Sequence, residues 1–227
     1  CPNQVHAFGT PVIRPLFVNY PSDEYSIDVD DQFMWGSGLM ISPIVYEESY
    51  NERRIYYPED IWYDYYTGQA IAGPLYANAY PSDMEIPLHL RGGSILPGQE
   101  PALNTMLSRQ NPFHLIVAPD ARGNAKGSLF WDDGQSQDTY ERGEYFLATY
   151  ELLVGQTLTS TPNDVGGIIG NETIGLVEFY GMVQSPLAVT VDVGTIIEFS
   201  YDQARQSLMV TTDIPLNSAF TLTLEYV

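Results

Sequence analysis

The stretch that decides the fold is Gln-Phe-Met-Trp-Gly-Ser-Gly-Leu-Met-Ile-Ser-Pro-Ile-Val, residues 32–45. It begins with bulky apolar residues at 33–35, and the two glycines that follow permit positive φ or close backbone approach. Residues 39–45 are apolar apart from a Ser-Pro pair, which is typical of a strand buried on both faces. Because an ordinary core segment with a glycine bend has the same pattern, the flanking sequence is needed to interpret this stretch.

On the N-terminal side of this stretch, residues 12–18 (Val-Ile-Arg-Pro-Leu-Phe-Val) predict a strand. Pro15 places that strand at an edge, a strand end or a bulge, and we expect Arg14 to pair in a polar network there. Residues 20–31 are acidic. The calcium-loop spacing of carboxylates is absent, so the sequence predicts a solvated loop with a helix cap rather than a metal site.

On the C-terminal side, short apolar segments alternate with Gly- and Pro-containing turns as far as the last residue. This rhythm is typical of all-β sandwiches, and no segment after residue 38 has a useful length of helical periodicity. Residues 98–112 are predicted to form a polar connection in which Arg109 caps or pairs. The expected strands are 40–46, 52–57, 62–66, 85–90, 113–118, 127–131, 144–150, 156–160, 175–180, 188–193, 195–201, 207–212 and 220–226.

Composition limits the class of partner. The chain has 227 residues, enough for one large or two small domains, and its 44% hydrophobic content suffices for a buried core. Asp and Glu number 29 against 9 Lys and Arg, a formal charge of −20. Such a surface repels nucleic acid and anionic membranes, so neither is an expected partner, whereas neutral sugars are compatible. An acidic surface also suits a secreted or lumenal protein.

Cysteine and histidine give little support for a metal or cofactor site. Cys1 is the only cysteine, so no disulfide can form within the chain; it either pairs with a segment outside these residues or stays a free or buried thiol. The histidines His6, His89 and His114 lack metal-ligand spacing. No apolar run is long enough to span a membrane, and no signal peptide begins the chain.

Several motifs in a fixed order are more specific than the hydrophobic and turn patterns, and together they resemble the C-terminal third of glycoside hydrolase family 31 α-glucosidases. The likeness is to the maltase-glucoamylase, sucrase-isomaltase and lysosomal acid α-glucosidase group, and it is tight over residues 5–150 and loose over 151–227. The motifs are PVIRPLF (11–17), QFMWG (32–36), SPIV (42–45), WYDYYTG (62–68), LRGGSILP (90–97), EPALNT (100–105), SRQ (108–110), GSLFWDDGQS (127–136) and DTYERG (138–143).

This resemblance implies an architecture. It implies a mainly-β chain in which residues 1–36 are the tail of a catalytic (β/α)8 barrel, with residues 12–17 as the last barrel strand. Residues 37–115 would form a proximal β-sandwich and residues 116–227 a distal one. The partner would be the upstream barrel segment of the same enzyme, and the α-linked gluco-oligosaccharide substrate would bind through that segment.

The resemblance also implies retaining hydrolysis of α-linked glucose from the non-reducing end, with no cofactor. That chemistry needs a nucleophile and an acid/base carboxylate about 5–5.5 Å apart. The family motifs that carry these carboxylates and the substrate-binding histidine do not occur in residues 1–227, so no catalytic residue is assigned to this chain. His6 corresponds to a histidine at the end of the last barrel helix and is expected to be structural.

Adjacent carboxylates in the chain are poor catalytic candidates. Asp132 and Asp133 are neighbours, so their side chains diverge on an extended segment, and the following glycine favours a tight turn that a carboxylate can cap. The pairs at 30–31 and 47–48 fail for the same reason.

Two surface features remain open from sequence. Trp62, Tyr63, Tyr65 and Tyr66 could stack on a sugar ring, although core packing is the favoured interpretation of alternating aromatics. The sequon Asn171-Glu172-Thr173 predicts N-glycosylation at Asn171, and the family resemblance implies an extracellular, brush-border or lysosomal location. The alternatives to a part of an enzyme are a free-standing carbohydrate-binding sandwich and a structural protein that has lost the activity.

Overall fold

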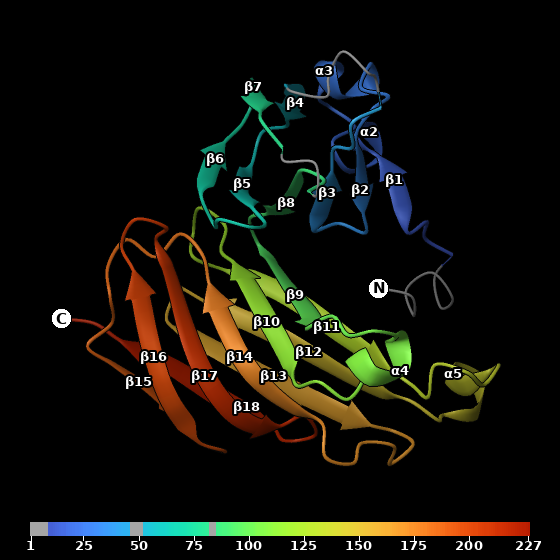
Figure 1. The fold of residues 1–227 in the computed structure, drawn as a ribbon, viewed down its shortest axis with the longest axis vertical. Helices are drawn as coiled ribbons and strands as arrows, with labels where there is room; N and C mark the ends of the chain where they lie inside the picture. The colour runs from blue at the N-terminus through green and yellow to red at the C-terminus, as the bar shows by residue number, and fades with distance from the viewer. Residues whose placement is uncertain (1–8, 46–51, 82–84) are drawn as a thin grey trace.

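The computed structural model describes residues 9–45, 52–81 and 85–227, and within them β-strands predominate (Figure 1). The mainly-β class predicted from the sequence is therefore confirmed. The strands form a six-stranded sheet, a two-stranded ribbon and a ten-stranded sheet. Among the described residues, none of the helices is both long and apolar enough to cross a membrane.

The smaller unit, formed by the described part of residues 9–92, is built on the six-stranded sheet. All neighbouring strands in this sheet are antiparallel, in the order β1 (Ile13–Pro15), β2 (Phe33–Trp35), β3 (Leu39–Ile41), β8 (Leu88–Arg91), β5 (Ile61–Asp64) and β6 (Ala70–Ala72). The ribbon of β4 (Arg53–Tyr57) and β7 (Leu75–Ala79) completes it. Its buried core consists of Leu16, Met34, Met40, Ile55, Tyr56, Tyr57 and Trp62.

The strand expected over residues 12–18 is wrong in its extent. The strand β1 ends at Pro15, and the short helix α2 (Leu16–Asn19) begins directly after it. Proline has no N–H to donate to a sheet ladder, and the change of direction carries Leu16 fully into the core. A second short helix, α3 (Glu24–Ile27), lies in the acidic segment and is capped by Asp23, as the predicted helix cap requires.

The stretch 32–45 forms a hairpin rather than one long strand. Trp35 on β2 pairs with Leu39 on β3, and Gly36 takes a positive φ of 67° in the turn. The strand predicted over residues 40–46 is therefore β3, which covers only residues 39–41, and the last of the predicted residues lies outside the described part of the chain.

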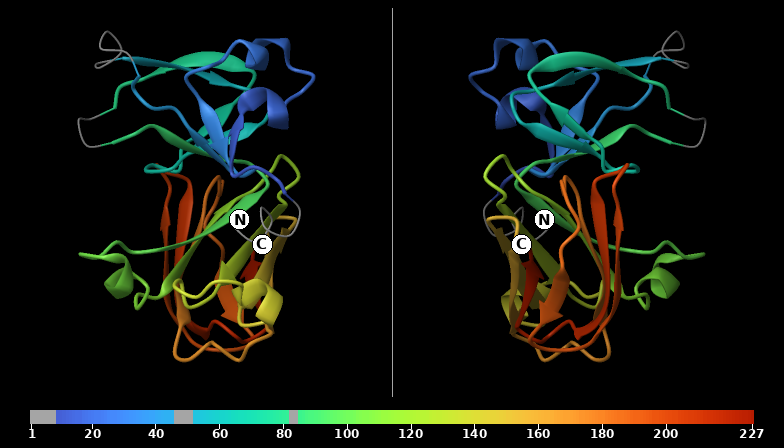
Figure 2. Two further views of the ribbon diagram at one scale, coloured as in Figure 1. Left: turned by 90° about the vertical axis from the view of Figure 1, so that its right-hand side faces the viewer. Right: turned by 90° about the vertical axis from the view of Figure 1, so that its left-hand side faces the viewer.

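The larger unit, residues 93–227, is a ten-stranded sheet folded over on itself into two layers (Figures 1 and 2). The strands at the two edges of this sheet lie close to each other, so the sheet almost encloses its core. The order is β15 (Ala188–Val191), β18 (Phe220–Glu225), β13 (Thr157–Asp164), β12 (Phe146–Leu153), β11 (Ala125–Trp131), β9 (Ser94–Gln99), β10 (Phe113–Ala118), β14 (Thr173–Phe179), β17 (Ser207–Pro215) and β16 (Ile196–Asp202). The short helices α4 (Thr105–Ser108) and α5 (Thr139–Arg142) lie outside the layers.

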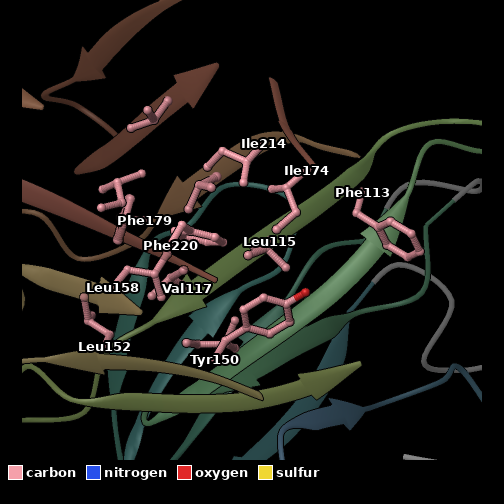
Figure 3. Close-up of a cluster of buried hydrophobic side chains, with 14 of the residues drawn as sticks. Phe113, Leu115, Val117, Tyr150, Leu152, Leu158, Ile174, Phe179, Ile214 and Phe220 are labelled. Atoms are coloured by element: carbon pink, nitrogen blue, oxygen red, sulfur yellow. The ribbon is translucent and has the colours of Figure 1, made fainter. Parts of the chain in front are cut away.

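Alternate residues of these strands fill the space between the layers. Phe113, Leu115 and Val117 on β10 all point inward, as the two-residue period of a strand requires (Figure 3). Tyr150 on β12 and Phe179 on β14 meet them from neighbouring parts of the sheet. This is the principal core of the chain.

The chain passes from the six-stranded sheet to the ten-stranded sheet at Gly92 and Gly93, between β8 and β9. The expected division between residues 115 and 116 falls inside β10, a strand whose residues all pair with β9. The expected domain limits, including the barrel tail at residues 1–36, remain predictions, and the hydrogen bonding favours a limit near residue 92.

Candidate functional site

A groove of about 810 Å³ lies where the two units meet. One wall is the β2–β3 hairpin, from Trp35 to Leu39, and the other is the outer surface of β9, β11, β12 and β13. The groove joins segments that are far apart in sequence, so sequence reasoning missed it. The lining residues are Trp35, Gly36, Ser37, Gly38, Leu39, Ser94, Ile95, Leu96, Pro97, Lys126, Gly127, Ser128, Leu129, Phe130, Thr149, Tyr150, Glu151, Thr159 and Thr161.

The chemistry of the groove suits binding better than bond cleavage. Hydroxyl-bearing and apolar residues make up most of its lining, and Lys126 forms an ion pair with Glu151 at 2.8 Å. Among the described lining residues Glu151 is the only carboxylate. A retaining glycosidase needs two carboxylates across the scissile bond, so these residues do not form such a catalytic pair.

The core packing favoured for the aromatic cluster is confirmed for Trp62 and Tyr63, and the alternative of a sugar platform is wrong for these two residues. Trp62 is fully buried and donates its indole N–H to the oxygen of Pro58 at 3.0 Å. Tyr63 is 4% exposed. Tyr65 is half-buried, and Tyr66 is the member that reaches the surface. Trp62 and Tyr63 are adjacent on β5 and point to opposite faces of the sheet, and each lies in a different buried cluster, so β5 is covered on both faces.

These tyrosines instead join the two units. Tyr63 donates to the oxygen of Pro119 at 2.9 Å, and Tyr180 donates to the oxygen of Tyr65 at 2.9 Å. Arg205 donates to the oxygen of Tyr66 at 2.7 Å. The rings of Tyr63 and Tyr180 belong to a buried cluster with Leu90, Ile116 and Ala118, which spans the junction.

His89 is a buried structural histidine. Its Nε2 atom lies 3.0 Å from the Tyr57 hydroxyl and 3.9 Å from a carboxylate oxygen of Asp64. Burial lowers its pKa from 6.5 to about 4, and the nearby Asp64 opposes that shift. The imidazole is therefore neutral at pH 7. His114 lies on another sheet, with its Nε2 atom 3.4 Å from Glu178.

Asp132 and Asp133 form a turn, as predicted, and do not face each other. The carboxylate of Asp132 accepts from the Gly134 N–H and the Thr139 hydroxyl. The carboxylate of Asp133 accepts from the Ser136 hydroxyl and N–H. The hydroxyl of Ser136 is the main reason that the pKa of Asp133 is lowered to about 2.

Arg109 holds the segment containing α4 against β11. Its guanidinium carbon lies 3.5 Å from the centre of the Trp131 ring, and the guanidinium donates to the oxygen of Asp132. The prediction that Arg109 pairs is confirmed. Sequence reasoning missed α4 itself, whose signal is the N-cap Asn104 accepting from the Leu107 N–H.

The acidic segment stabilises the smaller unit. Asp31 forms an ion pair with buried Arg53 at 2.9 Å, and Asp23 accepts from the Tyr56 hydroxyl at 2.7 Å. Arg14 donates to the oxygen of Pro11 at 2.7 Å. Within the described ranges, no three metal-ligating side chains come together.

Asn171 is exposed just before β14, where a glycan has room, and its glycosylation stays a prediction. Cys1, His6 and the carboxylates at 47–48 lie outside the described residues, so the disulfide proposed for Cys1 also stays a prediction.

Comparison with known proteins gives the family. Residues 9–96 match the model of the glycosyl hydrolase family 31 C-terminal domain. Relatives support the match: "Probable maltase-glucoamylase 2" of Homo sapiens is 47% identical over 149 residues, 65% of this chain. Residues 9–96 are a C-terminal domain of glycosyl hydrolase family 31. An "Alpha-glucosidase" of Schizosaccharomyces pombe is 34% identical over 208 residues, 89% of the chain.

The chain spans a small part of those relatives, 6% of the human protein and 21% of the yeast protein. A solved structure of the glucosidase II alpha subunit, in a Tris-bound form, matches 98% of this chain with a TM-score of 0.84. The match takes up 26% of that structure's chain at 23% sequence identity, so it supports the fold.

Proposed function

We propose that this chain is the non-catalytic C-terminal part of a retaining α-glucosidase that releases glucose from the non-reducing ends of α-linked oligosaccharides. The observation that carries the proposal is the family match to a C-terminal domain in a chain that spans 6% to 21% of relatives named for maltase or α-glucosidase. The absence of a carboxylate pair among the described groove residues is consistent with it.

In this proposal the reacting carboxylates belong to the upstream barrel, at the C-terminal ends of its strands. The contribution of residues 1–227 is support. Their two units pack through buried tyrosines and present further apolar surface to the barrel. At about 25 cal/mol per Å² of buried apolar area, such packing can decide whether a barrel stays folded. The location proposed is extracellular, brush-border or lysosomal.

The test compares maltose hydrolysis by the 227-residue chain and by the longer polypeptide that contains it. We expect hydrolysis by the longer polypeptide and none by the isolated chain. Clear maltase activity of residues 1–227 alone would refute the supporting role. Intact mass measured with and without reductant tests the Cys1 tether, because a linked segment would be released only by reductant.

The second candidate is a free-standing carbohydrate-binding module. The groove favours it, because Trp35 and Phe130 offer ring faces beside the hydroxyls of Thr149 and Thr159. It predicts binding of maltooligosaccharides by residues 1–227 alone, measured by calorimetry. Loss of that binding in Trp35→Ala would assign it to the groove. A protein that has lost its activity would instead lack the two catalytic aspartates upstream.

A further inference from the structure

The outer surface of the larger unit carries a stack of three aromatic rings. Phe130 lies on β11, Tyr140 lies on α5, and Tyr145 comes directly before β12. The ring centres of Phe130 and Tyr145 are 5.3 Å apart and those of Tyr140 and Tyr145 are 5.1 Å apart, with interplanar angles of 27° and 20°. These values are typical of offset stacking, which leaves part of each ring face open. Tyr140 is 37% exposed and the other two residues are half-buried, so the stack reaches solvent.

The turn and helix between β11 and β12 hold Tyr140 in this stack. The Thr139 hydroxyl donates to a carboxylate oxygen of Asp132 at 2.8 Å. Gly143 ends α5 with a positive φ of 69°, which directs the chain back towards β12. Rings that are already held in place lose little conformational freedom when a ligand binds, so this arrangement favours binding.

The stack continues into the groove between the two units, because Phe130 is also a groove residue. Next to it on the outer face, strand pairing sets Ser128, Thr149 and Thr161 side by side on β11, β12 and β13. These three residues line the groove as well, so a row of hydroxyl groups lies beside the rings. A sugar has a C–H face that packs on an aromatic ring and hydroxyl groups that exchange hydrogen bonds with side-chain hydroxyls.

The charge of the groove favours a neutral ligand. Lys126 and Glu151 are the only charged residues among the described residues that line it, and they form an ion pair with each other. The whole chain carries a formal charge of −20, so it repels nucleotides, nucleic acid and a second copy of itself. A neutral polyhydroxylated chain meets no such repulsion.

We propose that the stack of Phe130, Tyr145 and Tyr140, with the hydroxyl row beside it, binds successive glucose units of a neutral α-linked glucan chain. The rings contact the C–H faces of the sugars, and the hydroxyl groups of the row bond to the sugar rims. The inference rests on the proposed function, because it takes its ligand class from the α-linked oligosaccharides of that enzyme. It goes further in assigning glucan binding to residues of this chain.

Hydroxyl-radical footprinting of the full-length polypeptide with and without β-cyclodextrin tests the site directly. This cyclic α-linked glucan has no non-reducing end, so the proposed enzyme cannot hydrolyse it during the measurement. Tyr80, 73% exposed on the smaller unit, is the internal reference. We expect β-cyclodextrin to slow the oxidation of Tyr140 and Tyr145 several-fold relative to Tyr80.

Two footprinting results would overturn the inference. One is an oxidation rate of Tyr140 that β-cyclodextrin does not change. The other is a Tyr140 that is already as protected without sugar as Tyr150, which is 1% exposed. That second result would mean that another part of the polypeptide covers the stack.

Matched substitutions give a second measurement, the Kd of the full-length polypeptide for β-cyclodextrin by calorimetry. Tyr140→Ala should raise the Kd about three- to tenfold, because it removes one ring face from the stack. Tyr140→Phe keeps the ring and should bind like the unaltered protein. Tyr76→Ala is the control, since Tyr76 is 44% exposed and its ring also contacts another, that of Tyr56 at 4.8 Å. It should leave the Kd unchanged.

An equal Kd for Tyr140→Ala and the unaltered protein would contradict the site, and so would an equal rise in Tyr76→Ala. If Tyr140→Ala does not fold, the footprint of the unaltered polypeptide still decides. A polypeptide that hydrolyses maltose without protection of Tyr140 by sugar overturns only the glucan site. A polypeptide that shows this protection without hydrolysing maltose supports the glucan site and contradicts the enzymatic role.

Discussion

Tyr180 donates a hydrogen bond to the main-chain oxygen of Tyr65, 2.9 Å away, across the junction of the two units. Tyr180 follows β14 of the larger unit, and Tyr65 follows β5 of the smaller one. The Tyr180 ring also lies 6.1 Å from that of Tyr63, measured between ring centres. The junction is thus a packed, hydrogen-bonded contact.

Removal of this hydroxyl should weaken the junction. We expect Tyr180→Phe to lower the free energy of unfolding by about 1 kcal/mol, because the ring remains and one hydrogen bond is lost. Urea denaturation followed by fluorescence measures it. Tyr76→Phe is the control, since Tyr76 is 44% exposed, and it should cost less than about 0.5 kcal/mol. Equal costs would show that the Tyr180 hydroxyl adds nothing.

Acid should destabilise the fold through His89. Its pKa is about 4 in the folded protein against an ordinary 6.5, so the unfolded state binds more protons between these values. Stability therefore falls as the pH drops from 6.5 to 4, and the loss is complete below 4. This loss of unfolding free energy is on the order of 3 kcal/mol.

The variant His89→Phe isolates this contribution. Its free energy of unfolding should fall less than that of the unaltered protein between pH 7 and pH 4, because the carboxylates other than the neighbouring Asp64 contribute equally to both. Parallel pH profiles would show that burial of a neutral His89 is not what makes the protein acid-sensitive.

The stacking of Arg109 on Trp131 should not tolerate lysine. A guanidinium covers a ring face and donates in a fixed plane, whereas an ammonium does neither as well. We expect Arg109→Lys to cost about 1 kcal/mol of unfolding free energy. The control Arg122→Lys changes an exposed arginine in the turn after β10 and should be nearly neutral. A neutral Arg109→Lys would mean that α4 is held by other contacts.

Glycosylation at Asn171 is checked by mass. Material from a eukaryotic secretory host should lose mass on treatment with an N-glycosidase, and Asn171→Gln should show no such loss. An unaltered protein whose mass does not change would contradict the prediction, although Asn171 is exposed.

Local chemistry was predictable where a few neighbouring residues decide it. The Asp-Asp-Gly turn at 132–134 and the cap at Asp23 depend on side chains that bond to main-chain groups two or three positions away. The strand at 113–118 was predicted with its observed limits because all of its residues except His114 are apolar. The strand end expected as one possibility at Pro15 is confirmed, but the helix that follows was missed, since it depends on Leu16 reaching the core.

The sequence by itself determined the β-rich class, the turns and the family resemblance, because these depend on local pattern and on ordered motifs. Only the tertiary structure decided that Trp62 is buried, that the chain passes from one sheet to the other near residue 92, and that Trp35 faces an open groove. Each of these depends on which strands meet in space, and strand pairing between distant segments leaves no mark in either segment alone.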